Sequence, residues 1–280
     1  MINFFKTEKL QDGLTAIHTL SGEILYLIEG SKRAILVDTS VGIKGLRTFV
    51  EQLTTLPVTV LMTHGHLDHA MGAPEFDDVY MSHKDLDVYA GMQNIAGRME
   101  YVSGNLGGKL PEGMTEDDLV APAQVDFKDL KEGDSFDLGG IHIDVYDFPG
   151  HTPGSLAFLI RELRYVITGD ACNPFIFLFF DYSSKVCDYK QTVQNFKEKL
   201  AGQYDHILLS HGGVGDVEAR SSLFDDTMAI CDCIMEGKDD EVPFDFMGEA
   251  AYIAKAMTPP PFKRLDDGYG NIVYNKNRIF

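Results

Sequence analysis

Residues 63–69, with the sequence THGHLDH, combine four side chains that can bind a metal ion or move a proton. Three of the 9 histidines in the chain lie in this segment, which is a strong local excess. In an extended chain, positions two apart point the same way, so His64 and His66 can share one metal ion. The adjacent Asp68 and His69 point apart, or begin a helix, and can reach a second ion. The segment therefore predicts part of a metal site.

Three more candidate ligands follow apolar runs elsewhere in the chain. His151 lies in PGHTPGS, Asp170 in TGDA and His211 in SHGG. Each has glycine or proline beside it, and glycine lets the backbone turn tightly near a site. Open α/β sheets bind their ligands at the carboxyl ends of their strands, so these segments could converge with THGHLDH on one sheet edge. The seven candidate ligands are His64, His66, Asp68, His69, His151, Asp170 and His211.

These five imidazoles and two carboxylates are enough for two divalent metal ions per chain. The mixture suits zinc, and iron, manganese or nickel accept the same ligand types. A carboxylate between two dications can bridge them, and water held there becomes hydroxide near neutral pH. The residues therefore predict hydrolysis by a metal-activated water.

Strand-rich and helix-rich blocks alternate twice along the chain, and these elements have to position the ligands. Strands are predicted at residues 14–20, 24–29, 34–38, 58–63, 79–83, 126–130, 135–138, 141–148, 155–160, 165–168, 206–210 and 271–274. Apolar residues at helical spacing predict helices at residues 42–53, 84–102, 190–200, 217–235 and 246–257. Two sheets covered by helices are the simplest packing of this α/β pattern.

The domain prediction is a single domain over residues 1–280, because no linker divides the chain. Residues 84–122 are predicted to form a helical, lid-like insertion, since a helix there precedes a segment rich in glycine, proline and acidic residues. Residues 216–280 are predicted to form a mainly helical C-terminal extension.

Composition limits the partners. The formal charge of −19 disfavours nucleic acid and anionic membranes, which need a positive protein surface. No apolar run is long enough to cross a bilayer, and the N-terminal residues lack the basic start and apolar centre of a secretory signal. We therefore predict a cytoplasmic protein with a small-molecule substrate. Its 4 cysteines are predicted to be free thiols.

Residues 174–180, with the sequence PFIFLFF, begin four residues after Asp170 and must start near the site. One hypothesis is a buried strand, because the run has no polar face. A second is an apolar wall in which Phe175 and Phe177 face the metals and select a hydrophobic acyl or aromatic group. A third is a homodimer contact that covers the run.

The motifs HGHLDH, PGHTPGS, TGD and SHG, in this order, resemble those of the metallo-β-lactamase superfamily, over residues from about 14 to 212. The resemblance implies a four-layer αββα sandwich. It also implies that Asp38, at an early strand end, orients the metal loop from behind. It implies two ligand sets bridged by Asp170: His64, His66 and His151 for the first ion, and Asp68, His69 and His211 for the second.

Differences from the family pattern indicate which branches of the superfamily this chain resembles and which it does not. Most true β-lactamases place a cysteine where this chain has Asp170, and flavin-linked di-iron members lack a histidine at the position of His66. The ligand pattern is similar to hydroxyacylglutathione hydrolases (glyoxalase II) and to acyl-homoserine lactonases. Many lactonases carry a tyrosine where this chain has Asn173. Glutathione-binding members use C-terminal basic residues, for which the candidates here are Lys255, Lys263 and Arg264.

The predicted function is a dinuclear metal hydrolase in which a metal-bridging hydroxide cleaves an ester, thioester or lactone of a small molecule. Asp68 is the predicted catalytic residue, because it can orient the hydroxide or move a proton. The alternatives are a phosphodiester hydrolase, a mono-iron persulfide dioxygenase and a non-catalytic metal-binding protein. Metal content and turnover of esters separate these hypotheses.

Overall fold

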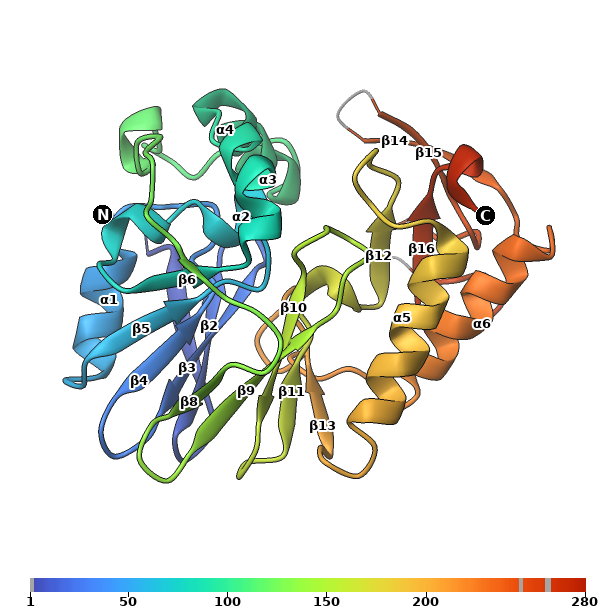
Figure 1. Cartoon of the computed structure of the whole chain (residues 1–280). Helices are drawn as coiled ribbons and strands as arrows, with labels where there is room; N and C mark the ends of the chain where they lie inside the picture. Colours follow the sequence, from blue (N-terminus) through green and yellow to red (C-terminus); the bar gives the residue numbers. More distant parts are fainter. Residues whose placement is uncertain (1–2, 247–248, 260–262) are drawn as a thin grey trace.

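The computed structural model describes residues 3–246, 249–259 and 263–280. Its strands form three sheets, and the two larger ones pack face to face (Figure 1). Helix α1 (Leu46–Leu53) covers the outer side of the first sheet, and α5 (Val186–Lys199) and α6 (Leu223–Met235) cover that of the second. This is the predicted α/β four-layer αββα sandwich. The third, smaller sheet is not anticipated by the sequence pattern.

The first sheet has the strand order β1-β2-β3-β4-β5-β6-β7. Its first four strands are antiparallel, and the strands from β4 onward are parallel. The strands are β1 (Phe5–Gln11), β2 (Leu14–Thr19), β3 (Ile24–Glu29), β4 (Ala34–Val37), β5 (Val58–Leu61), β6 (Val79–Met81) and β7 (Lys128–Asp129). Parallel neighbours need crossover connections, and these contain the helices. They are α1, α2 (Leu67–Ala70), α3 (Leu86–Gly91) and α4 (Ile95–Asn105), with short 3-10 turns between them.

The second sheet has the order β13-β11-β10-β9-β8, with β11 and β13 parallel and the other pairs antiparallel. Its strands are β8 (Ser135–Asp137), β9 (His142–Asp147), β10 (Leu156–Ile160), β11 (Tyr165–Ile167) and β13 (His206–Leu208). The third sheet has the order β12-β16-β15-β14. Its strands are β12 (Phe175–Leu178), β14 (Val242–Phe246), β15 (Glu249–Ile253) and β16 (Asn271–Tyr274).

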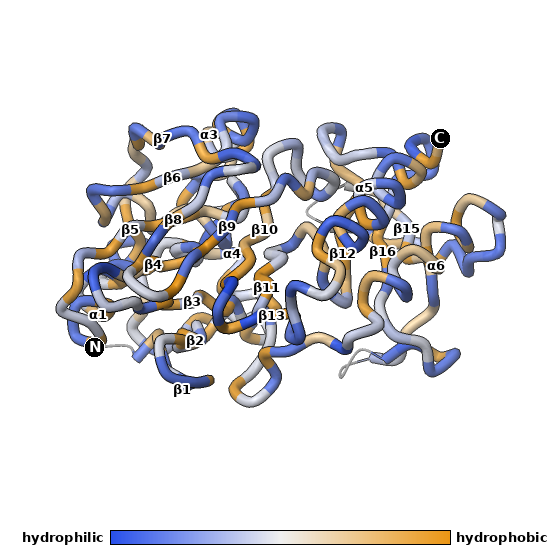
Figure 2. Tube along the Cα trace, turned by 60° about the horizontal axis from the view of Figure 1, so that its bottom comes forward, coloured by the Kyte–Doolittle hydropathy of each residue, from blue (hydrophilic) through white to orange (hydrophobic). Residues whose placement is uncertain are grey.

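The continuous apolar run of β3 shows why the sheets stack. Successive strand residues point to opposite faces. Leu25 and Leu27 pack toward the helices of the first layer, whereas Ile24, Tyr26 and Ile28 pack between the two large sheets. Each such side chain contributes about 1.5–3 kcal/mol on full burial. Figure 2 shows hydrophobic residues gathered along the central strands and mostly hydrophilic turns at the periphery. A strand that is apolar on both faces therefore has to lie between two layers.

The helix predicted at residues 246–257 is wrong, because residue 246 ends strand β14 and residues 249–253 form strand β15, which pairs with β14. The alanines favour a helix locally. Pairing of Ile253 with Val273 of β16, and burial of Ala251 and Ala254, outweigh that propensity. The C-terminal extension is consequently not mainly helical in its described residues. Residues 247–248 and 260–262, which share these predictions, lie outside the described part.

Other element predictions agree with the structure, including the strand at residues 271–274 and helices within residues 84–122. Strand β1 is missing from the sequence-based prediction. Within the described ranges, we find no helix with the length and apolarity needed to cross a membrane.

Candidate metal site

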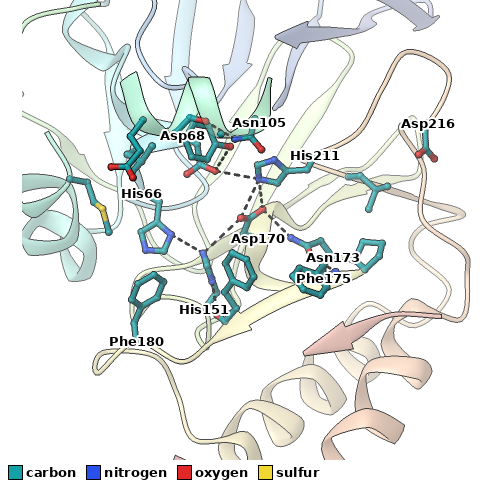
Figure 3. A pocket seen from close by; sticks show the side chains of 18 of the residues that line it. His66, Asp68, Asn105, His151, Asp170, Asn173, Phe175, Phe180, His211 and Asp216 are labelled. Atoms are coloured by element: carbon teal, nitrogen blue, oxygen red, sulfur yellow. Dashed lines mark hydrogen bonds and ion pairs between the residues drawn. The ribbon is translucent and has the colours of Figure 1, made fainter. Parts of the chain in front are cut away.

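Parallel strands bring distant ligand residues to one sheet edge. In the second sheet, Ile167 of β11 pairs with Leu208 of β13. Asp170 and His211 each come three residues later and therefore lie at the same edge. The same geometry in the first sheet, where β4 and β5 are parallel, places Asp38 beside Thr63. Figure 3 shows the side chains from both sheets meeting in one place.

The first group of ligand-type residues consists of three buried histidines, His64, His66 and His151. Their ring nitrogens converge. Nδ1 of His66 lies 3.1 Å from Nε2 of His64 and 2.8 Å from Nε2 of His151. Three imidazole nitrogens facing one point match the protein ligands of a zinc site that keeps one position open.

The outward nitrogens of these rings each have a partner. His151 donates from Nδ1 to the Phe177 carbonyl over 2.8 Å, which leaves the lone pair of its Nε2 facing the other rings. Nδ1 of His64 lies 3.0 Å from the Thr63 hydroxyl, and Nε2 of His66 lies 2.7 Å from the Tyr182 hydroxyl. Partners of this kind fix the tautomer and the orientation of metal-binding histidines.

The second group combines two carboxylates with two histidines: Asp68, His69, Asp170 and His211. Nε2 of His211 lies 3.2 Å from Asp170 Oδ1 and 3.5 Å from Asp68 Oδ2. Nε2 of His69 lies 3.6 Å from Asp170 Oδ2, which is itself 3.9 Å from Nε2 of His151 in the first group. Asp170 therefore faces both groups, as Figure 3 shows.

Asp38 supports the second group from behind, as the family resemblance implies. Its Oδ2 accepts a hydrogen bond from Nδ1 of His69 over 2.8 Å. The same carboxylate accepts from the backbone N–H and the hydroxyl of Thr63, over 2.7 and 2.8 Å. It thus ties the start of the THGHLDH segment to the ring of His69.

Asp85 has a corresponding position behind the first group, and the sequence analysis missed it. Its fully buried carboxylate accepts from the N–H of Gly65, the N–H of Gly154 and the Thr152 hydroxyl, over 3.0, 2.6 and 2.6 Å. A Cβ at Gly154 would lie 2.6 Å from this carboxylate, so the turn needs glycine. Asp85 joins the loops that carry His66 and His151, but it stands outside every recognisable motif.

The two groups differ in electrostatics. Burial, followed by the neighbouring imidazoles, holds the pKa of His64 well below its usual range. Burial acts the same way on His69, but Asp68, Asp170 and Asp38 outweigh it and hold the pKa of His69 well above its usual range. Burial is likewise outweighed at His211, where Asp170 and Asp68 raise the pKa to about 9.

The residues present fit divalent cations. The donor atoms of each group lie within 4.8 Å of one another. Neutral, buried imidazoles are the form in which histidine binds metal, and the carboxylates of the second group supply charge that a cation would neutralise. Each group can therefore hold one ion. The remaining histidines, His18, His83, His142 and His206, hydrogen bond elsewhere and belong to neither group.

A cavity of about 850 Å³ adjoins the two groups. Phe175 and Phe177 line it, as one hypothesis for the PFIFLFF run proposes, and Phe180 also lines it. On the opposite side, Tyr101 of α4 reaches the cavity from the predicted lid-like insertion and donates its hydroxyl to Asp68 Oδ2 over 3.0 Å. Asn173 donates to Asp170 Oδ1 over 3.1 Å, which makes it a neighbour of the site.

Comparisons with known proteins identify the family to which this fold and site belong. The family model of the metallo-beta-lactamase superfamily matches residues 25–211, so the chain belongs to that superfamily. Together with the metal-binding groups and the hydrolases among its relatives, this makes the chain a metal-dependent hydrolase.

Several curated relatives carry functional names. The acyl-coenzyme A thioesterase MBLAC2 of Homo sapiens is 23% identical over 201 residues, which cover 67% of this chain and 72% of the relative. The hydroxyacylglutathione hydrolase GloC of Haemophilus influenzae is 25% identical over 205 residues, which cover 70% and 89%.

Solved structures show the same fold at low sequence identity. A metallo-beta-lactamase from Pontibacter korlensis is similar with a TM-score of 0.55 and 14% identity, over 80% of this chain and 97% of that protein. The sec-alkylsulfatase Pisa1 from a Pseudomonas species is similar with a TM-score of 0.63 and 14% identity, over 83% of this chain but only 42% of the sulfatase.

Proposed function

We propose that the chain binds two divalent cations, zinc foremost, and hydrolyses an ester, thioester or lactone whose acyl group is apolar. The observation that carries the proposal is the position of Asp170. It faces an all-histidine group and a mixed group at the same time, beside a cavity with an apolar wall. Cations bound there would make water nucleophilic near neutral pH and would polarise the substrate carbonyl.

Each residue then has a defined part. His64, His66 and His151 hold one cation, His69 and His211 hold the other together with Asp68, and Asp170 faces both. Asp68 orients the attacking water and takes its proton. The Tyr101 hydroxyl, which donates to Asp68 Oδ2, fixes the rotation of that carboxylate. Substrate and water would approach from the cavity, because His66, His151, Asp170 and His211 line it.

The acyl side of the substrate would lie against Phe175 and Phe177, which line the cavity. The thioesterase and the hydroxyacylglutathione hydrolase among the relatives support a thioester as the cleaved bond. The basic residues considered for glutathione do not support that leaving group. Lys255 donates from Nζ to the Lys238 carbonyl and Arg264 pairs with Asp266, and none of Lys255, Lys263 and Arg264 lines the cavity.

Elemental analysis and a substrate panel test this proposal. Protein purified without chelator should contain about two equivalents of zinc, iron or manganese. The metal-loaded protein should turn over thioesters or lactones in preference to phosphodiesters. Fewer than one equivalent, with no gain on reconstitution, would contradict the two-cation site, and turnover restricted to phosphodiesters would contradict the proposed bond class.

Phe177→Ala tests the apolar wall. We expect KM to rise more for long-chain or aromatic esters than for acetyl esters, while the metal content stays intact. The Phe177 carbonyl that accepts from His151 is backbone and remains in the variant. An equal loss for all substrates, accompanied by a lower Tm, would instead assign Phe177 to the core. A change from dimer to monomer would support the homodimer contact predicted for residues 174–180.

We also propose a cytoplasmic location and a substrate other than nucleic acid. All four cysteines are free in the structure, as expected in a reducing compartment, and the net charge is −19.

A further inference from the structure

A row of aromatic rings runs from the first metal-binding group to the outer strand of the third sheet. The ring of Phe180 lies 5.5 Å from that of His66 and 4.3 Å from that of Phe179. Phe179 lies 5.5 Å from Phe177, which lies 6.1 Å from Phe244 of β14. The ring contacts are continuous, so the rings form one apolar cluster beginning at His66, in which Phe179 is buried and the other phenylalanines are partly exposed.

Strand alternation assigns this surface to one face of the third sheet. In β12, Ile176 and Leu178 are buried in the core formed with α5 and α6. Phe175 and Phe177 point to the opposite face, where they are only partly buried and cluster with Phe244. Phe175 also contacts Phe244 directly, with the ring centroids 6.5 Å apart. Phe244 is not among the residues that line the cavity, but it contacts the two phenylalanines of β12 that do.

The polar part of the cavity indicates what this wall can accept. Glu100 and Asp216 lie among the lining residues, and the described residues of the lining include no lysine or arginine. An anionic group placed along the aromatic row would find no counter-charge there, whereas an alkyl chain loses contact with water and gains contact with several rings. Charge and shape thus favour an uncharged, extended, apolar group.

We propose that the row formed by Phe180, Phe177, Phe175 and Phe244 is a binding subsite for a long linear acyl chain, and that Phe244 sets the preference for chain length. This inference rests on the proposed function, because the carbonyl of that acyl chain is the one attacked at the metal site. Phe244 lies outside residues 25–211, which the family model matches. The substrate class is then a thioester or ester of a medium- to long-chain fatty acid, selected by an element outside the shared family region.

Phe244→Ala tests the subsite with a series of acyl thioesters that share one leaving group, from acetyl to dodecanoyl. In the wild type, kcat/KM should rise with chain length. The variant should lose about tenfold in kcat/KM for dodecanoyl, with a much smaller change for acetyl, because only the long chain reaches ring 244. Phe280→Ala is the matched control, since this phenylalanine is 71% exposed at the C-terminus and outside the row. Equal losses for both substrates, or none, would overturn the proposal.

Binding of the product separates this proposal from the proposed function. Zinc-loaded wild type should bind dodecanoate more tightly than butanoate by calorimetry, and Phe244→Ala should weaken dodecanoate binding about tenfold. If the wild type turns over no ester, the proposed function fails, but dodecanoate binding that depends on Phe244 would still support the subsite. Equal dodecanoate affinity for wild type and variant, at unchanged metal content and Tm, would overturn the subsite.

Discussion

The two groups of candidate metal ligands share the THGHLDH segment and lie next to each other, yet their electrostatics are opposite. The group of His64, His66 and His151 contains only imidazoles and is buried, with each residue at most 6% exposed. The group around Asp170 contains two carboxylates, and the side chain of His211 is 32% exposed. Desolvation lowers the pKa values of His64 and His66 in the first group, whereas the neighbouring carboxylates raise those of His69 and His211 in the second. Neighbouring sites can therefore present different affinities and different pH responses to the same metal.

The difference follows from where each residue comes in the chain. Positions 64 and 66 share one side of an extended segment, and they meet His151 inside the protein. Asp68 and His69 lie in α2, which turns them toward Asp170 and His211 on the second sheet. Carboxylates there hold the pKa values of His69 and His211 above their usual range, and those histidines in turn hold the pKa of Asp170 well below its usual range despite burial.

The largest expected effect is a difference in pH dependence between the two ions. In the metal-free protein, the neighbouring carboxylates favour the protonated forms of His69 and His211, because they raise the pKa of both histidines, that of His211 to about 9. A cation must displace these protons, so affinity for the second ion should rise about tenfold per pH unit for each displaced proton as pH increases from 6.5 toward 9. His64 and His66 have lowered pKa values, so affinity for the first ion should stay flat over this range.

Zinc titration calorimetry at pH 6.5, 7.5 and 8.5, in buffers of different ionisation heat, measures both the affinities and the protons released. The same slope for both ions would contradict the comparison. Metal-free stability gives an independent check. Protonated His211 stabilises the fold because its pKa is higher in the folded than in the unfolded protein. This stabilisation is fully present below the pKa of the unfolded state and is lost as pH rises toward 9, so the metal-free Tm should fall over that interval.

Asp170→Asn should break the distinction between the groups. The change keeps the size of the side chain but removes the negative charge that faces His69, His211 and His151. We expect loss of one metal equivalent and a fall in kcat/KM of about a hundredfold or more. His142→Asn is the control, since His142 pairs with Glu162 at the surface and should leave both quantities nearly unchanged. Equal damage from the two variants would mean that the site is misassigned.

Substitution of two buried aspartates, one behind each group, should affect the two ions separately, with a smaller effect than Asp170→Asn. Asp38 contacts a histidine of the second group, whereas Asp85 holds the loops of the first. Asp38→Asn should weaken binding of the second ion by about 10–100-fold. Asp85→Asn should weaken the first ion and lower stability by about 1–3 kcal/mol, because one of three buried donors loses its acceptor. The affinity for each ion and the Tm, measured for both variants, test this prediction. The same change in both affinities for the two variants would contradict the assignment of Asp38 to the second group and Asp85 to the first.

The local sequence pattern was sufficient to predict an element where few structures are compatible with that pattern. The run ILYLIE at residues 24–29, bounded by turn signals, was predicted to be a strand, and the structure has β3 there. The ligand-rich segments were equally clear, because clustered histidines beside strand ends have few structural explanations. The helix prediction failed at residues 246–257. The alanines there favour a helix, but residues 249–253 form a strand because they pair with β16. Local propensity is worth tenths of a kcal/mol per residue and yields to such long-range pairing.

The sequence by itself was enough to propose the seven candidate ligands, to predict the layered sandwich and to recognise the apolar character of residues 174–180. Only the tertiary structure decided which side chains support them. Asp85, Tyr101 and Tyr182 contact the site from segments without a motif, and Phe244 reaches the aromatic row from a strand beyond the family match. Ligands are recognisable because their chemistry restricts the residue type. Supporting contacts are made by common residues whose role depends on which distant segments the fold brings within a few ångströms.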